Sequence, residues 1–493
     1  MGELSPEWAA AENAVALLIP VALPLLGGGV VLLLRHRPRV RESASVLVGV
    51  ALGAVVLSLW PMVDQQVRLD LWTWLPGFSL SLAVEPLGLL FASVAAVLWP
   101  LTTVFSVGYM RGTHQENLTR FYFFFALAIA AAMWVALSAN LVTLFIGYEA
   151  LTFVTWPLVS HQGGAAGRRG GRTYLVLLLV TSMGLLLPAI VWTGLLAGTT
   201  EFQAGGLLAD RAGPGVLAVL FALYLFGIGK AALMPFHGWL PAAMVAPTPV
   251  SALLHAVAVV KAGVFVVLKV SLYVFGLETL SAGDVTTLMR WVAAATLLVA
   301  GVLALRSDNL KRRLAYSTVS QLAYVVLGAT LANDVAFAGG ALHMVTHAVG
   351  KITLFFCAGA IFVACRKSRV SELDGLGRAM PWTFAAFLVA ALSIVGLPPG
   401  GGMWSKWLLL LGATEADQAA LVAVLLAGSL LSLGYLMPIV ARAFFRPLPA
   451  GLVHGEAPLS VVLPPVVTAA GCLGLFVGAE FVIAPVASVV DAP

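Results

Sequence analysis

Apolar runs long enough to cross a lipid bilayer recur along almost the whole of this 493-residue chain. A helix needs about 20 apolar residues to span the hydrocarbon core, and we count about 14 such stretches. The predicted spans are 14–34, 44–62, 86–109, 120–138, 140–160, 173–197, 214–236, 247–273, 288–305, 313–331, 335–364, 380–411, 419–445 and 459–480. Only 10% of the residues are charged and 61% are hydrophobic, which excludes a water-soluble globular protein of this size. The sequence therefore predicts an all-α polytopic membrane protein, embedded in the lipid bilayer.

The basic residues are unevenly distributed between the two sides of the predicted bundle. When the RHRPRVR loop at 35–41 is assigned to the cytoplasm, most of the 27 Lys and Arg fall in cytoplasmic loops, whereas Arg68, Arg211 and Arg290 fall outside. This asymmetry follows the positive-inside rule and explains the basic composition without nucleic-acid binding. We therefore expect a multi-pass protein of the cell inner (plasma) membrane with both termini outside.

The connections between the spans are short, and one of them has a strand pattern. QVRLDLWTWLPGFSLSLAVEP, within 63–85, alternates apolar and polar residues around a Pro-Gly turn, which predicts a small external β-hairpin. The chain is then divided into 1–119 (helices 1–3 and the hairpin), 120–273 (helices 4–8), 274–446 (helices 9–13) and 447–493 (helix 14).

Two predicted helices are interrupted by proline and glycine close to a lysine. LFGIGKAALMPFHGWLP places Lys230 five residues before Pro235, and LSIVGLPPGGGMWSKWLLL places Lys406 after Pro398 and Pro399. Such breaks are tolerated at membrane depth only where protein or water supplies hydrogen-bond partners. Broken helices in corresponding positions of two halves indicate a transporter's ion site. Because the breaks are five helices apart, two five-helix units would be inverted relative to one another. Simple proline kinks are the alternative.

Several ionisable residues lie within these apolar runs. A charge at the centre of a membrane helix costs roughly 2.5–3.5 kcal/mol, so residues kept there are expected to carry charge. Lys269 lies near a helix end and is interpreted as snorkelling to the interface rather than as functional. Arg306, Lys311, Arg312 and Arg313 are interpreted as a cytoplasmic anchor. The remaining buried set is Glu149, Lys230, Lys261, Lys351 and Lys406.

The stretch ALHMVTHAVGKITLFF arranges three titratable residues along one helix face. His343, His347 and Lys351 are spaced i, i+4 and i+8, which forms a stripe about 12 Å long. Two imidazoles leading to an amine predict a proton relay, since histidine titrates near neutral pH. The alternatives are a metal site, for which no further carboxylate or histidine is evident locally, and polar packing between helices.

Glu149 is the only carboxylate well inside a predicted helix of the first half. Placed beside Lys230, each charge would stabilise the other, and separation would let the lysine release its proton. A static buried ion pair is the alternative. In VSALLHAVAVVKAGVF, His255 and Lys261 are six residues apart, so they do not share one narrow face but can occupy successive steps of a path.

These motifs match a known family. GKAALMPFHGWLPAAMVAPTPVSALLHAVAVVKAG at 229–263 strongly resembles the signature of the antiporter-like subunits of respiratory complex I and of Mrp-type cation/proton antiporters. NLVTLFIGYEALTF, DNLKRRLAYSTVSQLAYVVLG and HMVTHAVGKITLFF resemble the same family, so that the match covers about 85–446. The resemblance implies 14 helices with inverted five-helix repeats, broken helices 7 and 12, and a hydrophilic axis across the membrane.

The resemblance also implies roles for individual residues. Glu149 and Lys230 would form the coupled pair and Lys261 the connection. His343, His347 and Lys351 would form the central relay, with Lys406 at the outlet. The supporting residues are His237, His255, Pro235, Pro398 and Pro399. Ala242 and Val245 stand where the common form of the helix 7–8 link has carboxylates, which argues against proton uptake through that link.

SELDGLGRAMPWTFAAF together with SKW resembles the D-type subunits of Mrp-like antiporters, and relatives in membrane-bound hydrogenases share it. The implied function is an ion-translocating subunit of a multisubunit Mrp-type Na⁺/proton antiporter, with other integral membrane subunits as partners. The alternatives are a proton-pumping subunit of complex I or a hydrogenase, and a structural scaffold. Dinucleotide, iron–sulfur and haem patterns are absent, so neither a cofactor nor redox chemistry of its own is expected. Cys357, Cys365 and Cys472 are interpreted as packing residues.

Overall fold

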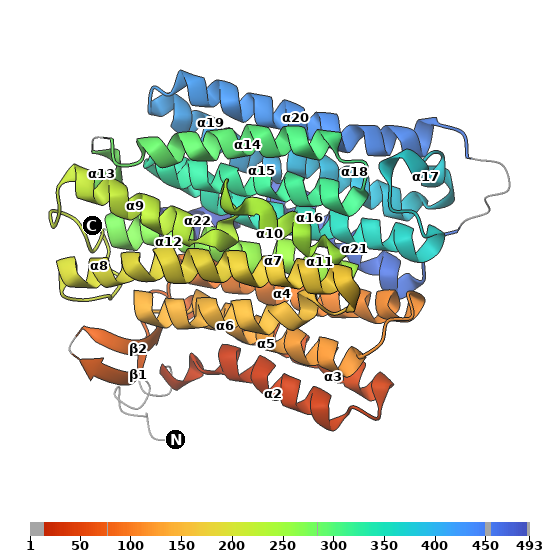
Figure 1. Cartoon of the computed structure of the whole chain (residues 1–493), viewed down its shortest axis with the longest axis horizontal. Coiled ribbons are helices and arrows are strands. Elements are labelled where there is room, and N and C mark those ends of the chain that lie inside the picture. Colours follow the sequence, from red (N-terminus) through yellow and green to blue (C-terminus); the bar gives the residue numbers. More distant parts are fainter. Residues whose placement is uncertain (1–13, 76, 283, 449–454, 491–493) are drawn as a thin grey trace.

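The computed structural model describes residues 14–75, 77–282, 284–448 and 455–490, which form a bundle of roughly parallel helices (Figure 1). Eleven helices in this part of the chain are long and apolar enough to cross a membrane. Three shorter apolar helices are Ile19–Leu33, Pro214–Gly227 and Pro381–Val395. Each predicted span corresponds to one of these helices, and the all-α polytopic fold is confirmed.

The elements of the first half are α2 (Ile19–Leu33), α3 (Pro38–Ser58), β1 (Arg68–Leu75), β2 (Phe78–Ala83), α4 (Pro86–Gly112), α5 (Leu118–Ala136), α6 (Leu141–Val159), α7 (Gly164–Thr181), α8 (Leu187–Ala197), α9 (Pro214–Gly227), α10 (Trp239–Ala242), α11 (Thr248–Ala252) and α12 (Val259–Val270). The second half contains α13 (Leu277–Ser281), α14 (Thr287–Arg306), α15 (Leu310–Leu331), α16 (Asp334–Cys365), α17 (Leu376–Ala379), α18 (Pro381–Val395), α19 (Gly402–Glu415), α20 (Ala419–Phe445), α21 (Leu459–Val477) and α22 (Glu480–Val490). Short 3₁₀ and π turns join several of them.

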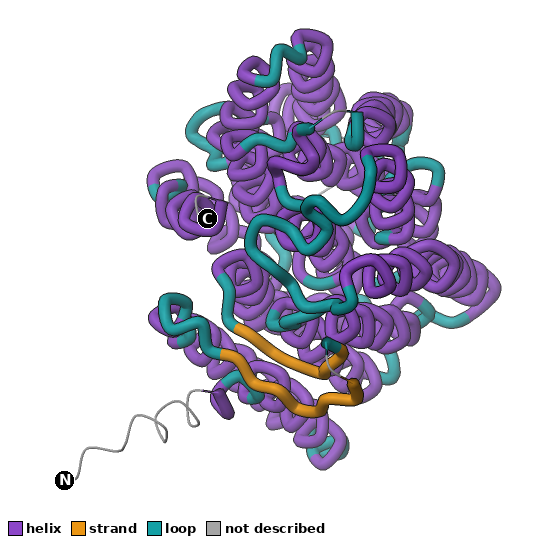
Figure 2. The backbone as a smooth tube through the Cα atoms, turned by 90° about the vertical axis from the view of Figure 1, so that its left-hand side faces the viewer, coloured by secondary structure: helices purple, strands orange, loops and turns teal. Residues whose placement is uncertain are grey.

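Strands β1 and β2 form an antiparallel hairpin at one end of the bundle, drawn in orange in Figure 2. Its pairing runs from Arg68 opposite Ala83 to Leu75 opposite Phe78, as the alternating sequence predicts. The backbone N–H of Ala83 donates to the carbonyl of Leu137, which fixes the hairpin on the helix ends. The predicted hairpin is therefore confirmed, and it marks one face of the bundle.

Asparagine side chains start three of the helices that carry candidate residues. Asn140, Asn309 and Asn333 accept hydrogen bonds from backbone N–H groups in the first turns of α6, α15 and α16. Each cap supplies a partner that the helix itself cannot give, and typically contributes about 1 kcal/mol. The beginnings of these helices are thus set locally by sequence.

Apolar side chains are found both at the centre of the bundle, where they are buried, and on its outer surface, where they are exposed. Every residue in the most apolar stretch of Thr248–Phe275 and of Leu310–Leu331 is buried. On the outer wall, apolar side chains are open, with Leu195 80% and Val477 87% exposed. Helices that are apolar on all sides, around a buried centre, are typical of a protein whose outer wall contacts lipid.

Both predicted helix breaks are present. Helix α9 ends at Gly227 and α10 begins at Trp239, with two short 3₁₀ turns between them. Helix α18 ends at Val395 and α19 begins at Gly402. A β-carbon on Gly400 would lie 2.6 Å from the Ser393 nitrogen, so the backbones on the two sides of the second break lie in close contact. The inverted relation of the two five-helix units stays a prediction.

Candidate functional site

The first broken helix holds Lys230 at the centre of the bundle. Lys230 lies in the short 3₁₀ turn Gly229–Ala231 that follows α9, and its side chain is fully buried. Glycines allow the neighbouring backbones to come this close: a β-carbon on Gly227 would lie 2.7 Å from the Leu186 Cα, and one on Gly263 would lie 2.7 Å from the Lys230 carbonyl oxygen. The break therefore packs tightly between α12 and the turn that joins α7 to α8.

The amine of Lys230 is bound by residues of α6. Its Nζ donates to the carbonyl of Tyr148 at 2.8 Å and to the hydroxyl of Thr152 at 2.6 Å. It also lies 3.2 Å from the centroid of the Tyr148 ring, and the Tyr148 hydroxyl accepts a hydrogen bond from the Lys230 backbone. These contacts, with the cation–π interaction, offset part of the cost of burying the ammonium group.

Glu149 directly follows Tyr148, yet it forms no ion pair with Lys230 within 4.0 Å. Its side chain is buried, and both carboxylate oxygens lack a hydrogen-bond partner in the part of the chain that the structure describes. A static ion pair, one alternative left open by the sequence, is not formed here. The structure brings the two residues to the same contact between α6 and the broken helix, and their coupling stays a prediction.

A line of titratable side chains continues through α12, α16 and α19. The amine of Lys261 hydrogen-bonds Nδ1 of His347. The rings of His347 and His343 lie nearly parallel, with centroids 5.9 Å apart. Nδ1 of His343 then lies 2.9 Å from the hydroxyl of Ser405. All four side chains are buried, so the spacing of His343 and His347 on one face does bring their rings together, as predicted.

Lys406 meets this line through an aromatic residue that the sequence analysis did not single out. Its Nζ donates to the Val395 carbonyl at 3.1 Å and to the Ser429 hydroxyl at 3.1 Å. The Tyr324 ring lies 4.4 Å from this amine and 5.3 Å from the His343 ring. The break between α18 and α19 thus frees the carbonyl that binds Lys406.

Lys351, on the same face of α16 as His343 and His347, binds a residue of α15. Its Nζ donates to the Ser317 hydroxyl at 2.5 Å. Ser317 in turn donates to the Tyr435 hydroxyl at 2.9 Å, and Tyr435 lies 3.0 Å from Ser432. Lys351 therefore begins a buried chain of hydroxyl groups between α15 and α20.

The two remaining histidines differ in position. His255 is fully buried, and its ring is tilted by 34° against that of Phe355, with the two centroids 4.6 Å apart. Neither of its ring nitrogens has a hydrogen-bond partner among the described residues. The His237 ring is half-buried, and its centroid lies 6.5 Å from that of Tyr316. Pro235, Pro398 and Pro399 are exposed at the two breaks.

The structure contradicts the interpretation of Lys269. Instead of snorkelling to the interface, Lys269 is fully buried and forms an ion pair with Glu85 at 2.5 Å. Its Nζ also donates to the Ser138 carbonyl at 2.6 Å. Glu85 precedes the first turn of α4 directly after the hairpin, so a residue distant in sequence covers the helix end. The position of Lys269 near the end of its helix does not indicate that Glu85 is its partner.

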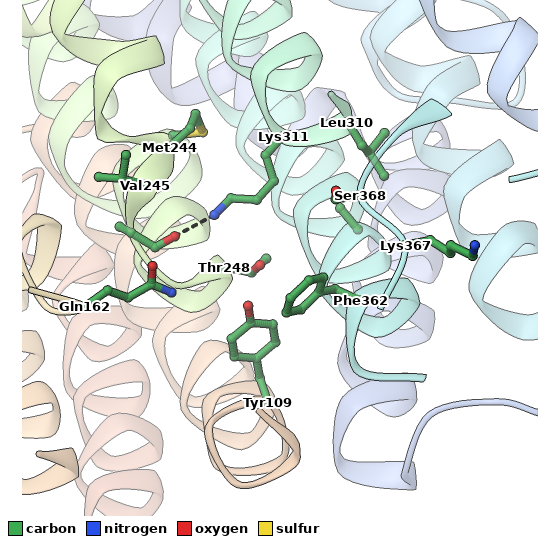
Figure 3. Close-up of a pocket in the computed structure, with 12 residues that line it drawn as sticks. Tyr109, Gln162, Met244, Val245, Thr248, Leu310, Lys311, Phe362, Lys367 and Ser368 are labelled. Carbon is green, nitrogen blue, oxygen red and sulfur yellow. Dashed lines mark hydrogen bonds between the residues drawn. The ribbon is translucent and has the colours of Figure 1, made fainter. Parts of the chain in front are cut away.

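A cavity of about 160 Å³ lies between the segment that joins α10 to α11 and the beginning of α15. Figure 3 shows the Lys311 amine reaching across it to the Ala246 carbonyl, a hydrogen bond of 2.5 Å. Lys311 and Arg313, interpreted as an anchor, thus bind backbone carbonyls inside the bundle. The side chains around the cavity include Tyr109, Gln162, Val245, Thr248, Lys367 and Ser368 and no carboxylate. Within the part of the chain that the structure describes, no group of three or more His, Cys, Asp or Glu side chains could hold a metal ion.

Comparisons with known proteins agree on one family. The family model described as "NADH:quinone oxidoreductase/Mrp antiporter, TM" matches residues 138–432. The chain is 30% identical, over 90% of its length and 86% of the relative's, to NADH-quinone oxidoreductase subunit N of Desulforudis audaxviator. It is 32% identical to NADH-quinone oxidoreductase subunit L of Pseudomonas aeruginosa, over 89% of this chain and 72% of that relative.

Two solved structures have the same fold. A chain of the Mrp complex from a Dietzia species superposes with a TM-score of 0.85 at 22% identity, and 97% of each chain is covered. A chain of a membrane-bound sulfane sulfur reductase, an archaeal respiratory membrane complex, gives a TM-score of 0.84 at 25% identity, covering 94% of this chain and 76% of that one.

Proposed function

Because this chain belongs to the family of membrane subunits shared by NADH:quinone oxidoreductases and Mrp antiporters, we propose that it is the ion-translocating subunit of a multisubunit Mrp-type Na⁺/proton antiporter. It moves protons along the buried line of lysine and histidine side chains, with other integral membrane subunits as its partners. Its place is the bacterial plasma membrane, with both termini outside.

The observation that carries this proposal is the run from Lys261 through His347 and His343 to Lys406. Each of these groups can hold or release a proton, and all are buried where an idle charge would be costly. The Lys261–His347 contact is direct, while Ser405 and Tyr324 lie between the later groups. A hydroxyl group can both donate and accept a hydrogen bond, so Ser405 and Tyr324 can pass a proton on.

Lys230 joins this line from the first half. Gly263 packs on the Lys230 backbone, and Lys261 lies two residues earlier on the same helix. No direct hydrogen bond between the two amines occurs, so the step requires bridging water, which is a normal partner for buried polar groups. When the Lys230 amine breaks its hydrogen bonds to Tyr148 and Thr152, the carboxylate of Glu149, the residue after Tyr148 on α6, stabilises its positive charge.

The cavity beside Lys311 lies on the expected cytoplasmic side, but no carboxylate lines it. Because Ala242 and Val245 replace the carboxylates of the common form, we do not place proton uptake there.

The test is transport by the assembled complex in proteoliposomes. A sodium gradient should drive proton movement without an electron donor, and Lys261→Ala should reduce that movement at least tenfold while assembly is kept. Arg378 is an exposed residue of α17, and Arg378→Ala is the control that should leave transport unchanged. Full activity of Lys261→Ala would refute the relay and favour a scaffold.

The second candidate is a proton-pumping subunit of a quinone oxidoreductase, favoured by the names of the curated relatives. In that case proton movement would require an electron donor and a quinone, and a sodium gradient alone would drive none. The single chain, expressed without partners, should show little or no exchange in everted vesicles under either proposal. Robust exchange by the purified chain alone would contradict the multisubunit assignment.

A further inference from the structure

A groove of about 320 Å³ lies on the outer wall where α3, α4 and α21 meet. Arg39 is the second residue of α3, Arg111 the last but one of α4, and Ser460 the second of α21. The beginnings of α3 and α21 and the end of α4 therefore meet at the groove, and since α4 begins directly after the hairpin, the groove lies at the end of α4 far from it. This places the groove at the level of lipid headgroups, not at mid-membrane.

The groove has two chemically different parts. Its rim carries Arg39, Arg111, Ser43 and Ser460, while Val46, Val104 and Val107 provide an apolar wall. One side of α3 also carries open apolar side chains, among them Leu47 at 68% and Val50 at 56% exposure. An occupant must therefore be polar at one end and apolar at the other.

The charge of the rim is positive and held in place. Glu42 also lines the groove, where it is buried and forms ion pairs with Arg111 and with Arg41, which is not part of the lining. Two arginines, Arg39 and Arg111, against one glutamate leave the lining with one net positive charge. Arg41 is itself fixed by a 2.7 Å hydrogen bond to the Thr119 hydroxyl and by the Tyr122 ring. Arginine binds phosphate through a planar fork of N–H donors, and basic pockets between membrane helices on the cytoplasmic side bind anionic headgroups.

We propose that this groove binds an anionic phospholipid, with the phosphate at Arg39 and Arg111 and an acyl chain along Val46, Val104 and Val107. The apolar wall favours a lipid over free phosphate, and the net positive rim favours it over an apolar helix of a partner subunit. The proposal does not depend on the transport function.

The test uses the full-length chain purified in a non-ionic detergent and titrated with phosphatidylglycerol or phosphatidylcholine, with bound lipid counted by native mass spectrometry. Wild type should retain phosphatidylglycerol in preference to phosphatidylcholine. Arg39→Gln should weaken phosphatidylglycerol binding about fivefold, the factor expected for one basic residue near an anionic surface. Arg35→Gln, an exposed arginine outside the groove, is the control and should change binding little.

A second variant separates a lipid from a free anion. Val107→Trp fills the apolar wall and leaves the arginines, so it should also reduce phosphatidylglycerol binding. Binding that survives Val107→Trp and is displaced by inorganic phosphate would overturn the proposal in favour of a free anion. Equal retention of the two lipids by wild type would overturn it as well, as would a fully assembled complex from which no phosphatidylglycerol is lost on Arg39→Gln substitution.

Discussion

Gly263 on α12 lies directly against the backbone of Lys230, and a β-carbon at position 263 would lie 2.7 Å from the Lys230 carbonyl oxygen. This contact joins the helix that carries Lys261 to the broken segment that carries Lys230. It leaves no room for any side chain, because the opposing atoms are backbone.

Gly263→Ala should therefore move Lys230 away from Tyr148 and Thr152. We expect a destabilisation of about 1–3 kcal/mol, as for overpacking in a core, together with a loss of most transport. Thermal unfolding in detergent and transport by the assembled complex measure the two effects. Gly29→Ala is the matched control, since a β-carbon there meets nothing within 4 Å. Equal behaviour of the two variants would show that the contact is not needed.

Glu149 offers a prediction about coupling. Its two carboxylate oxygens have no hydrogen-bond partner in the described part of the chain, so it is free to pair with Lys230 once that amine leaves α6. Glu149→Gln should keep assembly but slow transport at least tenfold, because the neutral amide cannot stabilise the ammonium. Glu480→Gln, at an exposed helix start, is the control. Transport at the wild-type rate in Glu149→Gln would separate Glu149 from the pathway.

The Glu85–Lys269 ion pair predicts a stability effect. Lys269→Met leaves Glu85 without its counter-charge and should destabilise the chain by about 3–5 kcal/mol. The double variant Lys269→Met, Glu85→Gln removes both charges and should recover much of that loss. Thermal unfolding of both variants, with Lys367→Met as a control, measures the difference. If the double variant is no more stable than the single one, an unpaired charge is not the cause.

The sequence predicted the spans, the hairpin and both breaks because those features are local. About 20 apolar residues suffice to define a span, and Asn140, Asn309 and Asn333 fix helix starts within one turn. The stacking of His343 and His347 also followed from spacing along one helix.

What failed depended on contacts between distant segments. Lys269 was misread because Glu85 comes from a segment far away in the chain. Tyr324, Ser405 and Ser317 were missed because hydroxyl-bearing residues in apolar helices have no pattern that separates a relay partner from a packing residue. The close packing of Gly400 and Gly402 on Ser393 likewise cannot be inferred from the order of residues along the chain.

The last prediction concerns Lys406, whose amine binds the carbonyl that the helix break frees at Val395. Lys406→Ala should abolish net transport, because the Tyr324–His343 end of the line then has no group to accept the proton. Lys406→Arg keeps the charge but should still lose most activity, since a guanidinium scarcely deprotonates. The Lys406 side chain is also closely packed, because a β-carbon on Gly396 would lie 2.7 Å from the Lys406 Cδ.

Measuring both transport and thermal unfolding of the assembled complex shows whether Lys406 releases protons or only packs in the helix break. If Lys406 only holds the break together, Ala and Arg should lower the unfolding temperature, and Lys406→Met, which fills a similar volume, should restore transport. If Lys406 releases protons, Lys406→Met should fold normally and remain inactive. Full activity in both the Ala and the Arg variant would remove Lys406 from the pathway, because neither side chain can exchange a proton near neutral pH.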